Sequence, residues 1–142
     1  TLQLTISLET SLIESVRQLP RGKFILEIDV FMLPTMIGTR QERPYFPYVV
    51  LMLDASNQAV VGYELLAPTP SLEDMWAEVG PTILQQIVEM GAAPKGIRVR
   101  HDLLNSILST FAKKLNLKVK QVAHLPGLDM ARMELDSMMR QV

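Results

Sequence analysis

The sequence contains no cysteine and no long apolar run, and each absence excludes a class of protein. Without cysteine the chain has no disulfide, no thiolate nucleophile and no sulfur ligand for zinc, which fits a reducing compartment. No apolar run approaches the ~18 residues that would cross a bilayer, and the N-terminal segment lacks the pattern of a signal peptide. We therefore expect a soluble, cytoplasmic protein without membrane contact.

Motifs of common enzymes are absent as well. No serine or threonine stands in a nucleophile-elbow context, no glycine-rich loop follows a predicted strand, and no HExxH pair occurs. These absences give no support to a serine hydrolase, a nucleotide-binding domain or a zinc peptidase. With 142 residues, 48% of them hydrophobic, the chain can bury the core of one ordinary domain.

The N-terminal part predicts a lead-in before the main domain. Residues 2–7 predict a short strand, and residues 8–19 predict a helix that ends at Pro20. We assign residues 1–22 to this lead-in and residues 23–142 to the domain. The chain opens at Thr1, which fits both a trimmed methionine and a piece of a longer protein.

The first half of the domain has the pattern of a β-meander. Residues 23–33 are apolar on one face and largely apolar on the other, which is typical of a strand inside a sheet. Residues 48–66 contain two β-branched runs joined by a turn at residues 54–57. This is the pattern of a β-hairpin.

The second half alternates helical and extended periods. Ser71 and Asp74 resemble a capping box at the start of a helix, which Gly80-Pro81 interrupts before it resumes and ends at Gly91. The remaining predicted elements are a strand at 96–100, a helix at 102–116, a strand at 118–123 and a helix at 129–141. The order β-β-β-α-β-α-β-α predicts an α/β (α+β) domain in which an antiparallel meander leads into parallel crossovers.

This order resembles the RNase H-like fold of retroviral integrases, transposases and Holliday-junction nucleases. Integrase-type cores have an Ile-containing strand that ends in a catalytic Asp, and a final helix with a phrase like "NARVE" whose Glu is catalytic. Here Asp29 matches the first catalytic Asp, and Glu134 in "MARME" matches the Glu. Over residues 23–140 the resemblance implies a mixed sheet, with a three-strand meander followed by parallel β-α-β-α units.

The chain departs from the family pattern at Arg100, which stands where the second catalytic Asp is expected. A two-metal nuclease needs clustered carboxylates, and a guanidinium cannot ligate Mg²⁺. The sequence is also similar to uncharacterised bacterial domains with a "P-x-x-I-x-V-R" strand and an "L-P-x-L-D" lead into the last helix. We therefore expect a degenerate active site in a non-catalytic interaction or regulatory module without a cofactor. The alternative is a divergent Mg²⁺- or Mn²⁺-dependent nuclease that uses Asp29, Asp102 and Glu134.

A third hypothesis is a non-catalytic nucleic-acid-binding domain. Residues 95–120 hold seven basic residues and one acidic, while the rest of the chain holds seven basic and fourteen acidic. Arg98 and Arg100 share one strand face, as do Lys118 and Lys120, so adjoining strands would present a stripe that can grip phosphates. The same charges can instead protect an edge strand from pairing. Only one aromatic residue, Phe111, lies among them, which disfavours single-strand stacking.

Two histidines follow the two predicted parallel strands. His101 and His124 would both reach the carboxyl edge of the sheet, where open α/β sheets bind ligands. With Asp102 and Glu134 they could supply N and O ligands to a metal, although their spacing matches no known metal motif. Asp102 and Asp129 are also well placed to cap helices.

The predicted last helix is rich in methionine. Met130, Met133, Met138 and Met139 form an apolar stripe, which either belongs to the core or offers an adaptable contact surface. The partner could be another protein or another domain of a longer chain. The sequence identifies neither.

Overall fold

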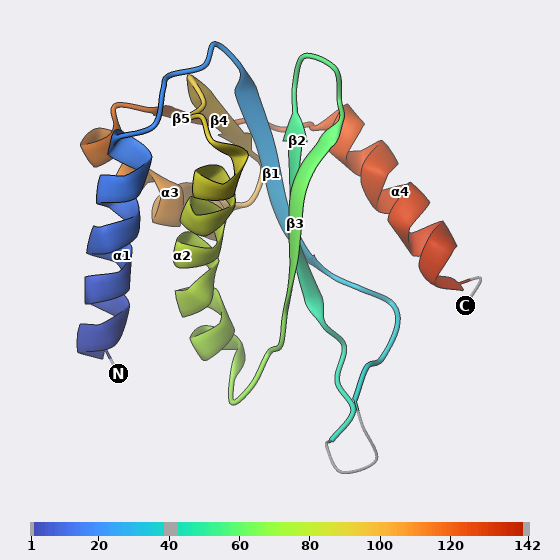
Figure 1. Cartoon of the computed structure of the whole chain (residues 1–142). Helices are drawn as coiled ribbons and strands as arrows, with labels where there is room; N and C mark the ends of the chain where they lie inside the picture. The colour runs from blue at the N-terminus through green and yellow to red at the C-terminus, as the bar shows by residue number, and fades with distance from the viewer. Residues whose placement is uncertain (1, 39–42, 141–142) are drawn as a thin grey trace.

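The computed structural model describes residues 2–38 and 43–140 (Figure 1). It contains a five-stranded mixed sheet and four helices. In chain order these are α1 (Leu2–Arg17), β1 (Ile25–Met32), β2 (Tyr48–Asp54), β3 (Val60–Leu66), α2 (Leu72–Met90), β4 (Gly96–Val99), α3 (Asp102–Leu115), β5 (Lys118–Gln121) and α4 (Pro126–Arg140). None of the described helices is long and apolar enough to span a bilayer.

The strand order in the sheet is β3-β2-β1-β4-β5. The pairs β1·β2 and β2·β3 are antiparallel, whereas β1·β4 and β4·β5 are parallel. The predicted antiparallel meander and parallel crossovers are thus confirmed. Strand β1 lies in the middle of the sheet and is buried along nearly its whole length, as its two largely apolar faces predict.

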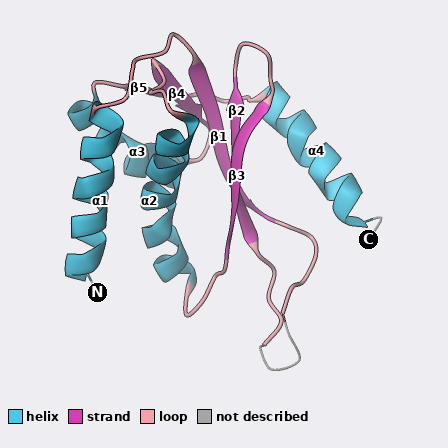
Figure 2. Ribbon diagram, in the orientation of Figure 1, coloured by secondary structure: helices cyan, strands magenta, loops and turns pink. Residues whose placement is uncertain are grey.

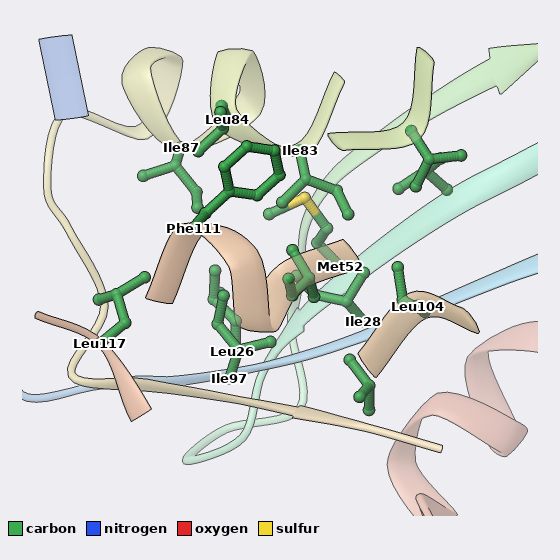
Figure 3. Packing of buried hydrophobic residues seen from close by; sticks show 14 of the residues in the cluster. Leu26, Ile28, Met52, Ile83, Leu84, Ile87, Ile97, Leu104, Phe111 and Leu117 are labelled. Atoms are coloured by element: carbon green, nitrogen blue, oxygen red, sulfur yellow. The ribbon is translucent and has the colours of Figure 1, made fainter. Parts of the chain in front are cut away.

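Helices cover the two faces of the sheet unequally (Figure 2). Helices α1, α2 and α3 pack on one face, where Ile28 and Met52 of the sheet meet Ile83 of α2 and Leu104 of α3 (Figure 3). Helix α4 packs on the other face through Leu128 and Leu135, together with Leu125, which directly precedes the helix. We call this second cluster the α4 cluster; its other buried members are Leu33, which follows β1, and the strand residues Phe31, Val49, Leu51 and Leu53.

The predicted hairpin turn is also confirmed. The Asp54 carboxylate accepts hydrogen bonds from the Ser56 hydroxyl at 2.7 Å and from the Ser56 backbone N–H at 2.9 Å. These bonds stabilise the ionised form and hold the pKa of Asp54 below its ordinary value. Side-chain bonds of this kind are the reason that Asp is common at the start of turns.

The prediction of a strand at residues 2–7 is wrong, because helix α1 already begins at Leu2. Leu12, Ile13 and Val16 pack in the same core as α2 and α3, so the second half of α1 is held in place by tertiary contacts. Adding residues to an existing helix gains one hydrogen bond per residue, whereas a strand needs a neighbour in a sheet. Residues 2–7 therefore extend α1 toward the N-terminus, although their short alternating pattern is typical of a strand.

The predicted interruption at Gly80-Pro81 is wrong as well, because α2 is continuous and contains Pro81. Proline removes the N–H that would bond to the carbonyl of Ala77. Ala77 is exposed, so water can reach that side of the helix. Gly80 lets α3 approach closely, since a Cβ there would lie 2.8 Å from the ring of Phe111. Packing against α3 thus compensates for the missing hydrogen bond.

Candidate functional site

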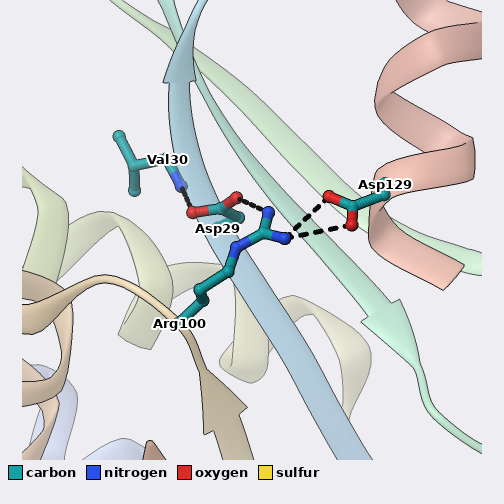
Figure 4. Close-up of polar contacts among 4 residues, drawn as sticks. All are labelled: Asp29, Val30, Arg100 and Asp129. Carbon is teal, nitrogen blue, oxygen red and sulfur yellow. Dashed lines mark hydrogen bonds and ion pairs between the residues drawn. The ribbon is translucent and has the colours of Figure 1, made fainter. Parts of the chain in front are cut away.

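An arginine lies between two carboxylates where β1, β4 and α4 meet (Figure 4). Arg100 directly follows β4, and its Nη2 donates to Oδ2 of Asp29 in β1 at 2.9 Å. Its Nη1 donates a hydrogen bond to Oδ2 of Asp129 in the first turn of α4 at 3.0 Å, and it lies 2.8 Å from Oδ1 of the same carboxylate in an ion pair. We call Asp29, Arg100 and Asp129 the ionic triad.

The triad runs from the protein interior to the surface. The side chain of Asp29 is 7% exposed, that of Arg100 28% and that of Asp129 48%. The second oxygen of Asp29 accepts the N–H of Val30 at 2.9 Å, so both of its oxygens have donors. Burial lowers the pKa of Arg100, but the hydrogen bonds and charges of the two aspartates raise it more, and the net shift is upward. Arg100 therefore stays charged and neutralises the buried Asp29.

The other carboxylates of the nuclease hypothesis lie elsewhere. Asp102 is the first residue of α3, and its carboxylate accepts a hydrogen bond from the side-chain amide of Gln121. Glu134 is exposed on α4. Across residues 2–38 and 43–140, no three His, Cys, Asp or Glu side chains are placed to hold a metal ion. The structure therefore does not bring Asp29, Asp102 and Glu134 together as ligands.

The capping roles predicted for two aspartates are wrong. Helix α3 already begins at Asp102, so the residue that caps it is His101, whose Nδ1 accepts the N–H of Leu103 at 3.1 Å. The Asp102 carboxylate instead accepts a hydrogen bond from Gln121. The ring of His101 also lies 5.1 Å from that of Trp76. Helix α4 begins at Pro126, which places Asp129 inside the first turn and in reach of Arg100.

The second predicted histidine stands apart from this cap. His124 is exposed in the connection between β5 and α4. No ligand group that includes His101 or His124 is found among the described residues. The two histidines therefore form no metal site in this part of the chain.

The predicted basic stripe exists without Arg100. Arg98 of β4 lies directly beside Lys120 of β5, and Gly96 lies beside Lys118. Neighbouring β4 residues Ile97 and Val99 belong to the core under α1, α2 and α3, so Arg98 points to the opposite face, the one on which α4 packs. The α4 cluster contains no residue of β4 or β5, and both lysines are exposed. Arg98, Lys118 and Lys120, which we call the basic half-face, thus lie on the part of the sheet that this cluster leaves uncovered.

A family model described as "Domain of unknown function (DUF6930)" matches residues 12–136. The chain belongs to this family. The matched segment of the DUF6930 domain begins inside α1 and ends inside α4, so it contains all five strands and the whole ionic triad. No curated protein matches the chain.

The methionines of α4 in this DUF6930 domain divide between core and surface. Met139 packs against the α4 cluster, while Met130, Met133 and Met138 are exposed. The stripe predicted from the sequence is therefore partly core.

A groove of about 880 Å³ lies between α1, α2 and β3 of the DUF6930 domain. Apolar side chains such as Leu12 and Leu66 line it together with four carboxylates. These are Glu64 of β3 and Asp74, Glu78 and Glu89 of α2, and we call the hollow the acidic groove. Our sequence reasoning missed it. Asp74, Glu78 and Glu89 follow each other at spacings of four and eleven residues, which places them on one face of a helix, and this signal could have revealed the α2 wall.

Proposed function

We propose that the DUF6930 domain is a non-catalytic module with an RNase H-like fold, which acts in the bacterial cytoplasm through interaction or regulation. The antiparallel meander followed by two parallel β-α units supports the fold, because the resemblance of the sequence implies this connectivity. The observation that carries the proposal is the 2.9 Å contact between Arg100 and Asp29.

A metal-dependent nuclease would need the Asp29 carboxylate as a ligand. In this chain both oxygens of that carboxylate already accept hydrogen bonds, one from Val30 and one from Arg100. The guanidinium stands beside the carboxylate as a fixed positive charge, and a divalent cation at the same place would be repelled by it. The contact therefore supports a structural role for Asp29 in place of a catalytic one.

Thermal unfolding with and without Mg²⁺ or Mn²⁺ tests the proposal. A metal that binds only the folded state at 100 times its Kd stabilises that state by about 2.7 kcal/mol. We expect no rise in Tm at 10 mM of either ion, for the wild type or for Asp29→Asn, and no cleavage of single- or double-stranded nucleic acid. A metal-dependent rise or a cleavage activity that disappears in Asp29→Asn would instead establish the divergent nuclease.

The basic half-face supports a second candidate function, binding of nucleic acid without cleavage. Arg98 and Lys120 are direct neighbours, and Lys118 lies two residues along β5 on the same face. Three cations on one open surface can each neutralise a phosphate. Each such contact makes the slope of the logarithm of the binding constant against the logarithm of the salt concentration more negative by about one.

Titration of a labelled duplex and a labelled single strand at several salt concentrations tests this candidate. The double variant Lys118→Gln/Lys120→Gln should lower the salt slope by about two. The matched control is Lys113→Gln/Lys114→Gln, which removes the same charge from α3, a helix on the other face of the sheet. Equal losses in both variants would mean that net charge alone drives the binding.

A further inference from the structure

The two edges of the sheet differ in how well they are protected from another strand. Strand β5 has four residues and carries two exposed lysines, and lysine on an edge strand discourages pairing. Strand β3 has seven residues without lysine, arginine or proline. Three of its apolar side chains are exposed: Val60 by 50%, Tyr63 by 65% and Leu65 by 41%. Of the two sheet edges in the described structure, the β3 edge is therefore the less protected one.

The outer backbone groups of β3 have no partner among the described residues. The strand pairs with β2 on one side, and no other hydrogen bond of its backbone is found in residues 2–38 and 43–140. Figure 1 shows β3 at the free edge of the sheet, between α2 and α4. The register shifts at Met52/Leu53, and such a bulge twists an edge away from partners, but the pairing from Gly62 to Leu66 is regular. These five residues can template another strand.

The two faces of β3 present different chemistry. Tyr63 and Leu65 pair with Leu51 and Val49, so they lie beside the α4 cluster. Glu64 alternates with them and points to the other face, where it lines the acidic groove. A strand added here would place one row of its side chains next to an aromatic and an aliphatic residue, and the other row over carboxylates.

The charge of the acidic groove selects the occupant. Four carboxylates line it, and no lysine or arginine of the described chain does. Gln86 Nε2 lies 3.4 Å from a carboxylate oxygen of Glu64 and brings no positive charge. Pairing of β3 with β3 of a second copy would bring two Glu64 side chains and two acidic α2 helices toward each other, and like charges across a strand pair destabilise it. The groove therefore favours a basic partner over a second copy.

We propose that the β3 edge binds an extended segment of a partner protein as a sixth strand, with basic residues over the acidic groove alternating with apolar residues beside Tyr63 and Leu65. Main-chain hydrogen bonds to β3 supply affinity in this mode, and the alternating side chains supply specificity. The inference rests on the proposed non-catalytic function, since it gives the interaction module a surface and a class of partner.

Fluorescence anisotropy with a labelled nine-residue peptide of alternating lysine and valine tests the proposal on the full chain. A peptide of the same composition with the lysines grouped at one end is the peptide control. We expect the alternating peptide to bind at least about tenfold more tightly, a difference of about 1.4 kcal/mol. Equal affinities would overturn the proposal, because they would mean unspecific attraction between charges.

Variants locate the binding site. Tyr63→Lys and Leu65→Lys change exposed side chains and should each weaken binding of the alternating peptide by about tenfold, through the same repulsion that protects natural edges. Glu78→Gln should weaken it severalfold, whereas Glu73→Gln, an exposed acid of α2 that does not line the groove, should not. Circular dichroism checks that each variant is folded. Equal effects of Glu78→Gln and Glu73→Gln would refute the role of the groove.

Hydrogen exchange decides whether a strand is added. The alternating peptide should slow exchange of the amides of residues 62–66, which binding to the groove alone would leave unchanged. Light scattering must show a monomer. A dimer that dissociates on Tyr63→Lys would make the edge an interface between copies and overturn the partner proposal. A negative result in any of these binding experiments would leave the metal and nuclease assays unaffected. The proposed non-catalytic function is therefore tested independently of the β3 edge.

Discussion

Replacing Arg100 by methionine would leave the carboxylate of Asp29 without its cation. That side chain is 7% exposed, and its remaining hydrogen-bond donor in the described chain is the N–H of Val30. Removing one partner of a buried ion pair costs about 3–5 kcal/mol. Because Arg100 is 28% exposed, water screens the pair in part, and we expect a loss of about 2–3 kcal/mol in the free energy of unfolding. For a domain of this size the Tm should fall by about 5–10 °C.

Urea unfolding followed by the fluorescence of Trp76, the one tryptophan of the chain, measures this loss. Arg98→Met is the matched control, since Arg98 lies in β4 two residues before Arg100 and has no ion pair in the described structure. It should change stability by at most about 0.5 kcal/mol. Adding Asp29→Asn to Arg100→Met should restore about 1 kcal/mol, because the buried group is then neutral. Equal losses at positions 98 and 100, or no recovery with asparagine, would show that the triad does not stabilise the fold.

Three smaller predictions concern caps and turns. Gly91→Ala should cost about 1 kcal/mol in urea unfolding, because Gly91 ends α2 at φ 81°, a conformation that strains alanine. His101→Ala should also cost about 1 kcal/mol by removing the cap of α3, and Asp102→Ala should cost less, since Asp102 does not cap. The pKa of Asp54 is lowered by Ser56, so its carboxylate stabilises the fold above the unfolded pKa of about 3.8, and this contribution is lost as the pH falls through the folded value. Asp54→Asn should therefore flatten the decline of Tm with falling pH in that range.

The sequence predicted the sheet well because its strands have strong local signals. Strand β1 has two largely apolar faces, and the hairpin has a turn whose Asp54 forms the expected local hydrogen bonds. It predicted α1 and α2 less well because both depend on distant contacts. Residues 2–7 continue a helix held by the core, and Pro81 stays inside α2 because Phe111 packs against Gly80. No local pattern contains these contacts.

The sequence predicted which residues belong to the candidate site, but it did not predict the contacts between them. The sequence identified Asp29 as a candidate because it lies in a buried strand, and Arg100 because it stands at the end of another strand. Their contact spans 71 residues of sequence, and the third member, Asp129, reaches it only because α4 begins at Pro126. A change of one residue in the register of α4 would rotate Asp129 by about 100° around the helix axis, away from Arg100. Ion pairs between distant elements depend on the assembled fold. The sequence could therefore identify the charged residues, but it could not predict which of them form ion pairs with one another.

Two cationic contacts in the described structure attach α4 to the sheet. Arg100 binds Asp129 in the first turn of α4, where a carboxylate also interacts favourably with the helix dipole. Arg132 of α4 lies 4.4 Å above the ring of Phe31 in β1. Arg100 thus fastens a helix over the same carboxylate, Asp29, that a nuclease would keep open to its metal and substrate. The non-catalytic function that we propose uses surfaces that α4 leaves free. The basic half-face and the β3 edge are two such surfaces of the described chain, and they lie at opposite ends of the strand order. A ligand on one can therefore be measured without blocking the other.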